Sequence, residues 1–257
     1  MKRLENKVAI ITGGGGGIGS ATAALFVREG AKVLLVDCNE QALREVVHVI
    51  NNKDAVSYVL ADVTQPDQVQ NYVNKAVERY GRIDVFINNA GIEDDFSPIT
   101  EHSIETFDKV MAVNVKGVWL GLKYVIPEME KQGGGSIVIT SSTSGVSGAP
   151  GLSAYVASKH AVVGIMRSVA PECAPLNIRV NTINPGITET QMMRALEKKI
   201  LPENPQQARQ DLLEQCPLKR YATPEEIAKF MLFLAGDESS YCTGGVYMVD
   251  GGRPKRR

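Results

Sequence analysis

A run of five glycines, residues 13–17, lies between a short apolar segment and a stretch with helical spacing, and it constrains the fold more than any other feature. Because glycine has no Cβ, the backbone there can adopt positive φ and approach a ligand closely. The helix expected over about residues 18–29 would direct its free N–H groups at a phosphate. A tight turn without a ligand is the alternative, but five glycines would be a costly way to build one. The order of strand, glycine turn and helix therefore predicts a dinucleotide-binding unit.

Short apolar runs alternate with longer amphipathic stretches along the whole chain. The runs are rich in β-branched residues and nearly continuous, as in strands covered on both faces; they occupy residues 8–11, 33–36, 56–60, 85–87, 137–139, 178–180 and 246–249. Helical segments between them imply right-handed crossovers. The pattern predicts an α/β fold, a single Rossmann-type domain over residues 1–257 with a doubly wound parallel sheet and helices on both faces.

Composition and charge exclude several classes of protein. The formal net charge of −1 gives no long-range field that would attract nucleic acid or an anionic membrane. No apolar run approaches the roughly 18 residues that suggest a membrane span. The N-terminus also lacks the apolar stretch of a signal peptide. We therefore expect no nucleic-acid partner and no membrane association.

The four cysteines form no recognisable ligand pattern. There is no CxxC pair, and the spacing fits no zinc motif; the cysteines are Cys38, Cys173, Cys216 and Cys242. We expect no metal site and a reduced, cytoplasmic protein. The basic cluster at residues 253–257 is interpreted as a solvated tail rather than a binding patch.

One segment, residues 188–216, departs from the alternating pattern. It contains helix formers, Pro202 and Pro205, and no expected strand. A segment of this kind after a strand often forms a mobile lid over a site. The segment is predicted to be a lid; a helical excursion on the surface is the alternative.

Asp37 ends the second expected strand, 20 residues after Gly17. A carboxylate at this place can accept hydrogen bonds from the adenosine ribose hydroxyls and would repel a 2′-phosphate. It could instead cap the next helix, which would not conflict with ribose binding. No basic residue lies in the glycine turn, so we expect NAD (NADH) as cofactor in preference to NADP.

Tyr155 and Lys159 are spaced i, i+4 in a stretch with helical pattern, which places them on one face of a helix. A free tyrosine titrates near pH ~10 and is a poor base at neutral pH. A neighbouring ammonium stabilises the phenolate. The pair favours a tyrosine of lowered pKa, although a tyrosine and a lysine at this spacing do not by themselves indicate catalysis.

Several further motifs surround this pair in a characteristic order. Residues 12–19 read TGGGGGIG, Asn88-Asn89-Ala90-Gly91 follows the fourth expected strand, and Asn184-Pro185-Gly186 follows the sixth. Asn114 stands at an expected helix start, and Ser142 precedes Tyr155 by 13 residues. Over residues 7–252 the sequence resembles the classical short-chain dehydrogenase/reductase family. Each motif alone has a structural alternative, such as a polar loop at Ser142 or a helix cap at Asn114.

The resemblance implies roles for four residues. Tyr155 is expected to be the general acid/base, and Lys159 to hold the nicotinamide ribose and lower the tyrosine pKa. Ser142 is expected to stabilise charge on the substrate oxygen. Asn114 is expected to hold a water that links Lys159 to solvent.

The resemblance also implies which residues bind the cofactor. Besides Asp37, Tyr155 and Lys159, these are Gly13, Gly17, Ile18, Gly19, Asp62, Val63, Asn89, Ala90, Gly91, Pro185, Gly186, Ile187 and Thr188. The candidate substrate residues are Glu93, Ser144, Val146, Met192 and Met193; the acidic run 93–95 should rim the site, and the two methionines could form an adaptable apolar wall.

These observations together predict an enzyme. We expect an NAD-dependent oxidoreductase that interconverts a secondary alcohol, of cyclic, steroid-like or diol type, and its ketone. The alternatives are a reductase of the 3-oxoacyl type and a non-enzymatic NAD-binding sensor or scaffold. The resemblance further implies a homotetramer. Pro171 departs from the family pattern, and we expect it to kink or shorten the catalytic helix.

Other conspicuous side chains are assigned no part in catalysis. The histidines His48, His102 and His160 are not expected to act in the reaction. Trp119, with Leu120 and Leu122, is expected on a buried helix face rather than in a ligand cage.

Overall fold

The structure, a computed structural model, describes residues 2–253. Of the basic tail expected at 253–257, all but Arg253 lie outside the described residues. Within them one sheet contains all the expected strands, which are β1 (Val8–Thr12), β2 (Lys32–Asp37), β3 (Val56–Leu60), β4 (Val85–Asn88), β5 (Gly135–Thr140), β6 (Ile178–Pro185) and β7 (Val246–Val249). They pair in parallel in the order β3-β2-β1-β4-β5-β6-β7.

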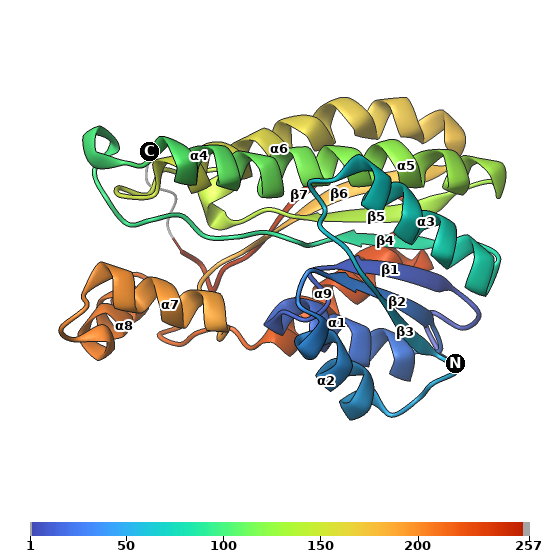
Figure 1. Cartoon of the computed structure of the whole chain (residues 1–257), viewed down its shortest axis with the longest axis horizontal. Helices are drawn as coiled ribbons and strands as arrows, with labels where there is room; N and C mark the ends of the chain where they lie inside the picture. The colour runs from blue at the N-terminus through green and yellow to red at the C-terminus, as the bar shows by residue number, and fades with distance from the viewer. Residues whose placement is uncertain (1, 254–257) are drawn as a thin grey trace.

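Helices cover both faces of this sheet (Figure 1). One layer contains α1 (Gly17–Arg28), α2 (Glu40–Ile50) and α9 (Pro224–Ala235). The other contains α3 (Pro66–Tyr80), α4 (Ile104–Met111), α5 (Gly117–Lys131) and α6 (Ser153–Cys173). Each layer packs its apolar residues on one sheet face, giving two separate cores around Phe86 and Phe26. The Rossmann-type doubly wound fold predicted from the sequence is confirmed.

The strand order reverses where β1 pairs with both β2 and β4. In doubly wound sheets, ligands bind in the crevice outside the carboxyl ends of the strands at such a switch point. The glycine turn follows β1, Asn89 follows β4 and Ser142 follows β5, all at this edge, and Tyr155 and Lys159 come from the first turns of α6. The topology therefore brings together residues that the sequence separates.

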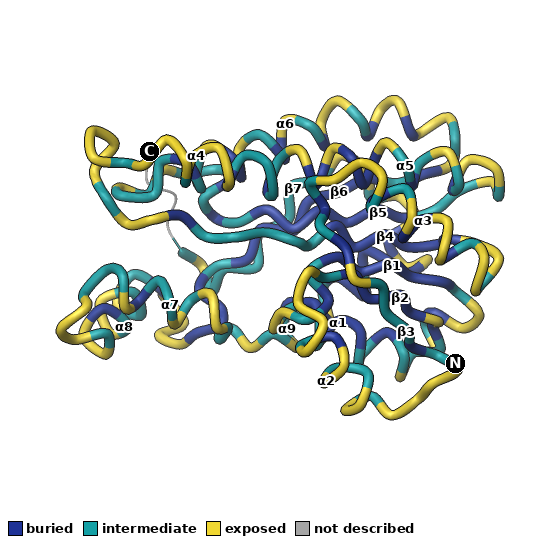
Figure 2. Tube along the Cα trace, viewed as in Figure 1, coloured by how far each residue is buried: buried dark blue, intermediate teal, exposed yellow. Residues whose placement is uncertain are grey.

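The segment 188–216 extends away from the sheet as two helices, α7 (Gln191–Ile200) and α8 (Pro205–Glu214) (Figure 1). A small apolar cluster of its own, centred on Ile187, Cys216 and Tyr221, supports it. Figure 2 shows how the dark blue of the sheet gives way to partly and fully exposed chain in this region. The segment therefore shares little of the two main cores, and polar side chains on its surface make much of its contact with the rest of the molecule.

The shorter helical segments complete the described chain. They are the 3₁₀ turns Ile99–Glu101, Thr143–Gly145, Ala174–Leu176 and Asp237–Ser239, and the π-helical turn Ala112–Lys116. None of the helices in residues 2–253 has the length and hydropathy that a membrane crossing requires.

Three local expectations are wrong in whole or in part. Asn114 does not start a helix: it lies in the π turn that joins α4 to α5 in one continuous rod. α6 does not end at Pro171 but continues to Cys173, so the expected early end is wrong, and the kink at Pro171 stays a prediction. Trp119 is not buried but 50% exposed, although Leu120 and Leu122 are buried as expected. The ammonium of Lys123 lies 5.4 Å from the Trp119 ring centroid.

Candidate active site

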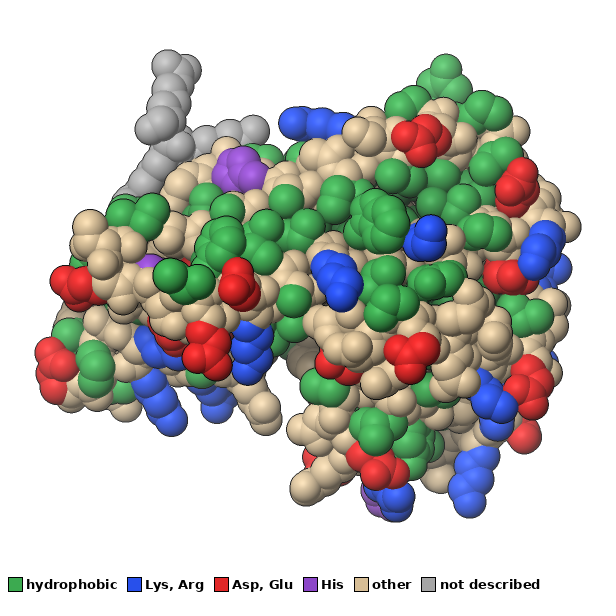
Figure 3. Space-filling view, turned by 45° about the horizontal axis from the view of Figure 1, so that its top comes forward, with side chains coloured by type: hydrophobic (Ala, Val, Ile, Leu, Met, Phe, Trp, Pro, Cys, Tyr) green, Lys and Arg blue, Asp and Glu red, His purple; other side chains and the backbone are tan. Residues whose placement is uncertain are grey.

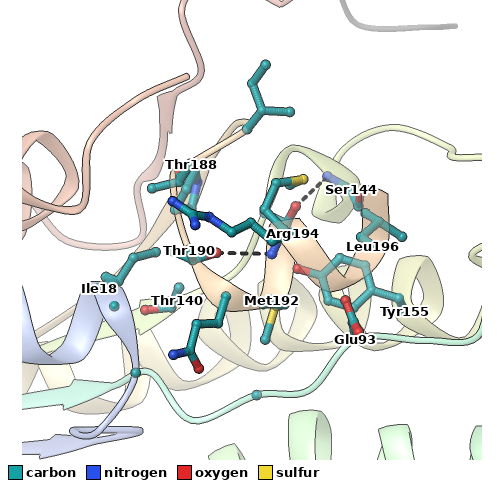
Figure 4. A pocket seen from close by; sticks show the side chains of 18 of the residues that line it. Ile18, Glu93, Thr140, Ser144, Tyr155, Thr188, Thr190, Met192, Arg194 and Leu196 are labelled. Atoms are coloured by element: carbon teal, nitrogen blue, oxygen red, sulfur yellow. Dashed lines mark hydrogen bonds between the residues drawn. The ribbon is translucent and has the colours of Figure 1, made fainter. Parts of the chain in front are cut away.

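A cleft of about 1340 Å³ opens at the carboxyl edge of the sheet, between the glycine turn and α7. Figure 4 shows Tyr155, Glu93 and the α7 side chains Met192 and Leu196 around it. Most predicted site residues line the cleft: Gly13, Gly17, Ile18, Asp37, Asn89, Gly91, Glu93, Ser142, Ser144, Tyr155, Lys159, Pro185, Gly186, Ile187, Thr188, Met192 and Met193. Those outside its lining are Gly19, Asp62, Val63, Ala90, Asn114 and Val146.

The glycine turn is built by backbone contacts that exclude side chains. Gly13 has a φ of +65°, in the left-handed region that favours glycine. Its carbonyl accepts a hydrogen bond from Gly16 N at 3.1 Å. A Cβ on Gly19 would lie 2.1 Å from that same carbonyl oxygen. Gly19 therefore does not line the cleft. Its lack of a side chain allows the first turn of α1 to pack directly against the glycine turn.

Asp37 braces this turn from the end of β2. Its Oδ2 accepts a hydrogen bond from Gly15 N and its Oδ1 one from Asn39 N, both at 3.0 Å. The helix-capping alternative is wrong, since the side chain of Asn39 accepts from Ala42 N at the start of α2. The carboxylate of Asp37 is left at the cleft wall beside the turn.

Asn89 joins the ends of three strands. Thr12 Oγ1 accepts hydrogen bonds from the backbone N of Asn89 at 2.9 Å and of Ala90 at 3.0 Å. Thr140 Oγ1 in turn donates to Asn89 Oδ1 at 3.1 Å. These contacts hold β1, β4 and β5 in register at the floor of the cleft, and Ala90 contributes through its backbone.

Tyr155 and Lys159 project from the first turns of α6, as their spacing predicted. Lys159 is only 5% exposed, and its Nζ donates to the carbonyl of Thr140 at 3.0 Å. The same Nζ lies 5.5 Å from the centroid of the Tyr155 ring. Burial lowers the pKa of Lys159 to about 8.

The pKa of Tyr155 is shifted opposite to the expected direction. Burial raises the pKa of this phenol, a hydrogen bond with Ser142 acts to lower it, and the charge of Glu93 raises it further. The expectation neglected desolvation of the phenolate in a narrow cleft. Without a ligand, Tyr155 is thus a neutral phenol at physiological pH.

Ser142 is held in place at the end of β5. Its hydroxyl accepts a hydrogen bond from Ser144 N at 3.1 Å, and its carbonyl accepts one from the Asn184 side chain at 2.8 Å. Ser144 thereby touches the site through its backbone. The hydroxyl of Ser142 remains able to donate to Tyr155 or to a substrate oxygen.

Asn114 is fully buried and its side chain is engaged by protein groups. It accepts from Ile92 N at 2.8 Å and donates to Ile92 O and to Ser158 Oγ, each at 3.0 Å. Ser158 in turn donates to the carbonyl of Tyr155 at 2.7 Å. The Asn114 side chain thus links the π turn to the loop after β4 and to α6. Since this side chain is occupied, a water next to Lys159 would have to be held by backbone atoms of the π turn. Such turns are frequent at functional sites.

The sequence placed Asp94 only within the acidic run expected to rim the site, and the structure buries it completely. Its Oδ2 accepts a hydrogen bond from the backbone N of Tyr155 at 2.9 Å, and its Oδ1 lies 2.5 Å from His102 Nε2. Leu152, at the N-cap of α6, makes no side-chain cap. Asp94 therefore caps α6 from a distant loop, with His102 in contact with its carboxylate. An acidic run next to a histidine eight residues away was the only signal.

Lys199 of α7 was also missed. Its Nζ lies 3.1 Å from Glu93 Oε1 and 3.5 Å from Asp95 Oδ1, and it donates to Asp94 O at 3.0 Å. One cation thus fastens α7 to the loop that follows β4. A second tie within the segment joins Arg209 to Glu189 and Glu197.

The residues at this edge fit a dinucleotide. The glycine turn offers a cradle in which the first N–H groups of α1 lack helical partners, as a diphosphate requires. Asp37 stands where a ribose diol would reach, and Lys159 and Tyr155 stand at the far end of the cleft. Among residues 2–253, no group of three or more metal-binding side chains comes together.

Comparisons with known proteins agree with this geometry. A family model described as enoyl-(acyl carrier protein) reductase matches residues 14–253. Levodione reductase of Leifsonia aquatica is 41% identical over 255 residues, covering 98% of this chain and 95% of that relative. A 3-oxoacyl-[acyl-carrier-protein] reductase of Thermotoga maritima is 44% identical over 251 residues, covering 97% of this chain and 98% of that relative.

Solved structures extend the similarity to the fold. A levodione reductase structure matches with a TM-score of 0.95 at 42% identity, over 97% of this chain and 98% of that one. NAD⁺-bound xylitol dehydrogenase matches with a TM-score of 0.93 at 34% identity, over 98% of this chain and all of that one (100%). Sequence motifs, sheet topology and relatives therefore agree: the chain belongs to the classical short-chain dehydrogenase/reductase family of oxidoreductases.

Proposed function

We propose that this protein is an NAD-dependent dehydrogenase that interconverts a secondary alcohol and its ketone. The observation that carries the proposal is the buried Lys159 ammonium 5.5 Å from the Tyr155 ring, in a cleft that begins at the glycine turn. The NAD⁺-bound xylitol dehydrogenase neighbour supports a nicotinamide cofactor. Asp37 supports NAD over NADP, because its carboxylate would repel a 2′-phosphate.

The cofactor residues divide along the cleft. The glycine turn, with Ile18 and Gly19 behind it, would hold the diphosphate. Asp37 would hold the adenosine ribose, with Asp62 and Val63 beside the adenine. Residues 89–91 and 185–188 would line the nicotinamide end. Bound NAD supplies the hydride acceptor and, when oxidised, a positive charge that favours the phenolate of Tyr155.

The protein's own groups handle the substrate oxygen and its proton. Tyr155 and Ser142 would both hydrogen-bond that oxygen, which fixes the carbinol carbon for hydride transfer. In ketone reduction Tyr155 Oη donates its proton to the substrate oxygen and becomes a phenolate. In alcohol oxidation the phenol first releases its proton to solvent, and the resulting phenolate then accepts the hydroxyl proton. The raised pKa makes the neutral phenol the resting form, so Tyr155 is ready to act as the acid. Lys159 positions the ribose and stabilises the phenolate when it forms.

A spectrophotometric screen tests this function. The protein is incubated with NAD or NADP and a panel of cyclic, steroidal and vicinal-diol alcohols, and absorbance at ~340 nm is followed. We expect NADH formation with at least one secondary alcohol and a higher kcat/KM with NAD than with NADP. Tight NADH binding without turnover of any alcohol or ketone would instead support a non-enzymatic sensor.

A second candidate is reduction of a 3-oxoacyl thioester. The Thermotoga maritima relative, which carries that name, favours it. Acetoacetyl-coenzyme A with NADH is the discriminating substrate. Turnover faster than with any alcohol or simple ketone would give this function precedence.

We further propose that residues 188–216 act as a lid. Met192 and Met193 of α7 line the cleft, and Lys199 fastens the helix to the opposite loop. Limited proteolysis should cut this segment more slowly when NADH is present. Equal rates of cleavage would argue for a fixed surface excursion.

The assembly is proposed to be a homotetramer. Large apolar side chains are exposed along the rod formed by α4 and α5, namely Ile104 (80%), Phe107 (43%) and Trp119 (50%). Figure 3 shows green side chains gathered on the face formed by these helices and α6. Light scattering should give four times the chain mass, and Trp119→Glu should reduce it.

A further inference from the structure

One carboxylate oxygen in the cleft has no partner. Glu93 follows β4 and lines the cleft beside Tyr155 (Figure 4). Its Oε1 lies 3.1 Å from Lys199 Nζ. Its Oε2 is buried and makes no hydrogen bond with any described residue.

This oxygen differs from the other buried groups without partners. The others among the described residues are Arg3 Nε, Tyr72 Oη, Asn184 Oδ1 and Tyr221 Oη. Tyr72 and Tyr221 pack within apolar clusters, and Arg3 and Asn184 do not line the cleft. Glu93 instead lines the cleft with 20% of its side chain exposed, and because Oε2 itself is buried, a small turn of the carboxylate is needed to present this oxygen to a ligand. A desolvated carboxylate oxygen is costly to leave unpaired. The group that satisfies it is therefore expected to enter the cleft with the ligand.

The surroundings of Glu93 limit what that group can be. Lys199 already pairs with Glu93 Oε1 and with Asp95, which weakens the attraction of this carboxylate for a second ammonium. The carboxylates of Asp94 and Asp95 follow directly in the chain, so an anionic substituent would be repelled more strongly. A neutral hydroxyl is the donor that fits. Glu93, which would accept its hydrogen bond, lies on the same side of the cleft as the phenol of Tyr155.

We propose that Glu93 Oε2 accepts a hydrogen bond from a second hydroxyl of the substrate, so that the enzyme acts on diols or polyols and the matching hydroxyketones. The inference rests on the proposed dehydrogenase function and specifies its substrate class. Lys199 sets the Glu93 carboxylate through Oε1 and leaves Oε2 for the ligand. The contact that fastens α7 thereby also orients the specificity residue.

Matched substrates test the proposal. Cyclohexanol is compared with cyclohexane-1,2-diol and cyclohexane-1,3-diol as substrates with NAD, using the wild type, Glu93→Leu and Glu93→Gln. We expect the wild type to prefer one of the diols by about 10- to 100-fold in kcat/KM, the range for a hydrogen bond to a charged group. Glu93→Leu should lose that preference, and Glu93→Gln, which keeps an acceptor, should retain part of it.

Asp95→Asn is the matched control. Asp95 is an exposed neighbour that contacts the same Lys199, so its loss should leave the ratio of diol to cyclohexanol turnover within about twofold of the wild type. An equal ratio in the wild type and Glu93→Leu would overturn the proposal. So would a wild type that prefers cyclohexanol.

A binding readout separates this inference from the proposed function. The same diols are added to the NADH-bound protein, and the midpoint of thermal unfolding is recorded. We expect a diol-dependent rise in Tm for the wild type that is absent in Glu93→Leu. Such a rise without any turnover would refute the dehydrogenase function but keep the diol site. Turnover of cyclohexanol without a diol effect would refute only the diol site.

Discussion

The two halves of the cleft are held in different ways. The half proposed for the cofactor is set by backbone geometry: Gly13 with positive φ, Gly19 against a carbonyl, and Asn89 tied to Thr12 across neighbouring strand ends. The half proposed for the substrate is set by side chains that meet from segments far apart, such as Lys199 with Glu93 and Asp94 with Tyr155. The first half is suited to bind a constant ligand. In the second half, the substitution of a single side chain can alter which ligand binds.

The largest effect is expected where the halves meet, at Lys159. Lys159→Met removes the ammonium that supports the phenolate, so kcat/KM should fall by about 10²- to 10⁴-fold. Steady-state assays with the best alcohol measure this, and Lys116→Met, on an exposed lysine, is the control. A loss of less than tenfold would contradict the role of Lys159.

The same variant gives a pH-dependent stability. Burial lowers the pKa of Lys159 from its ordinary 10.5 to about 8, so below pH 8 the folded protein carries an ammonium that burial disfavours. Burying this charge lowers the free energy of unfolding by about 3 kcal/mol, an amount that the hydrogen bond to Thr140 partly offsets. This loss disappears as the pH rises from 8 to 10.5, because the amine first becomes neutral in the folded state and then also in the unfolded state. Urea unfolding should show Lys159→Met more stable than the wild type at pH 7, with the gap closing over that interval. A gap independent of pH would reject this account.

The backbone nature of the cofactor half is tested at Gly19. In Gly19→Ala the new Cβ would meet the Gly13 carbonyl at 2.1 Å, so the turn must shift. Overpacking of this kind costs about 1–3 kcal/mol, and we expect it mainly as weaker NADH binding, measured by fluorescence titration. Gly164→Ala, in α6 with open space around it, should instead stabilise the fold by up to about 1 kcal/mol. Equal NADH affinity in both variants would show that the turn is not built as described.

In the half of the cleft proposed for the cofactor, Asp37 is the side chain expected to set the preference for NAD over NADP. Asp37→Asn keeps an oxygen that can accept from Gly15 N but removes the charge. The ratio of kcat/KM for NAD to that for NADP should fall about tenfold, since hydrogen bonds to charged groups are the stronger ones. Asp54→Asn, on an exposed turn, is the control. If the ratio does not change, the ribose assignment is wrong.

The smallest effect is expected at the distant cap of α6. Asp94→Asn weakens both the hydrogen bond to Tyr155 N and the contact with His102. Loss of a helix cap costs about 1 kcal/mol, so kcat should fall about fivefold through misplacement of Tyr155, with little change in KM for NAD. Stability and kinetics are compared with Asp95→Asn. A change in cofactor KM alone would assign Asp94 to the other half of the cleft.

The contrast between the halves also explains what the sequence could predict. The apolar runs, the glycine turn and the i, i+4 pair of Tyr155 and Lys159 are local patterns. From them the sequence predicted the seven strands and the residues that form one wall of the cleft. Asp94 and Lys199 could not be assigned their contacts this way, because Asp94 lies 61 residues from Tyr155 and 105 residues from Lys199. His102 is only eight residues from Asp94, but no local pattern shows that the two side chains meet.

Two further misjudgements have physical reasons. The pKa of Tyr155 depends on desolvation, which only a three-dimensional cleft reveals. The exposure of Trp119 was missed because helical periodicity does not tell whether a tryptophan faces the core or a free surface.

The central claim is that Tyr155 transfers the proton while the rest of the cleft only binds and positions. The most direct test is Tyr155→Phe, with NADH affinity and single-turnover reduction of a ketone measured on the same sample. We predict an unchanged dissociation constant for NADH and a rate of turnover lowered by about 10²- to 10⁴-fold. Turnover at the wild-type rate in that variant would contradict the mechanism.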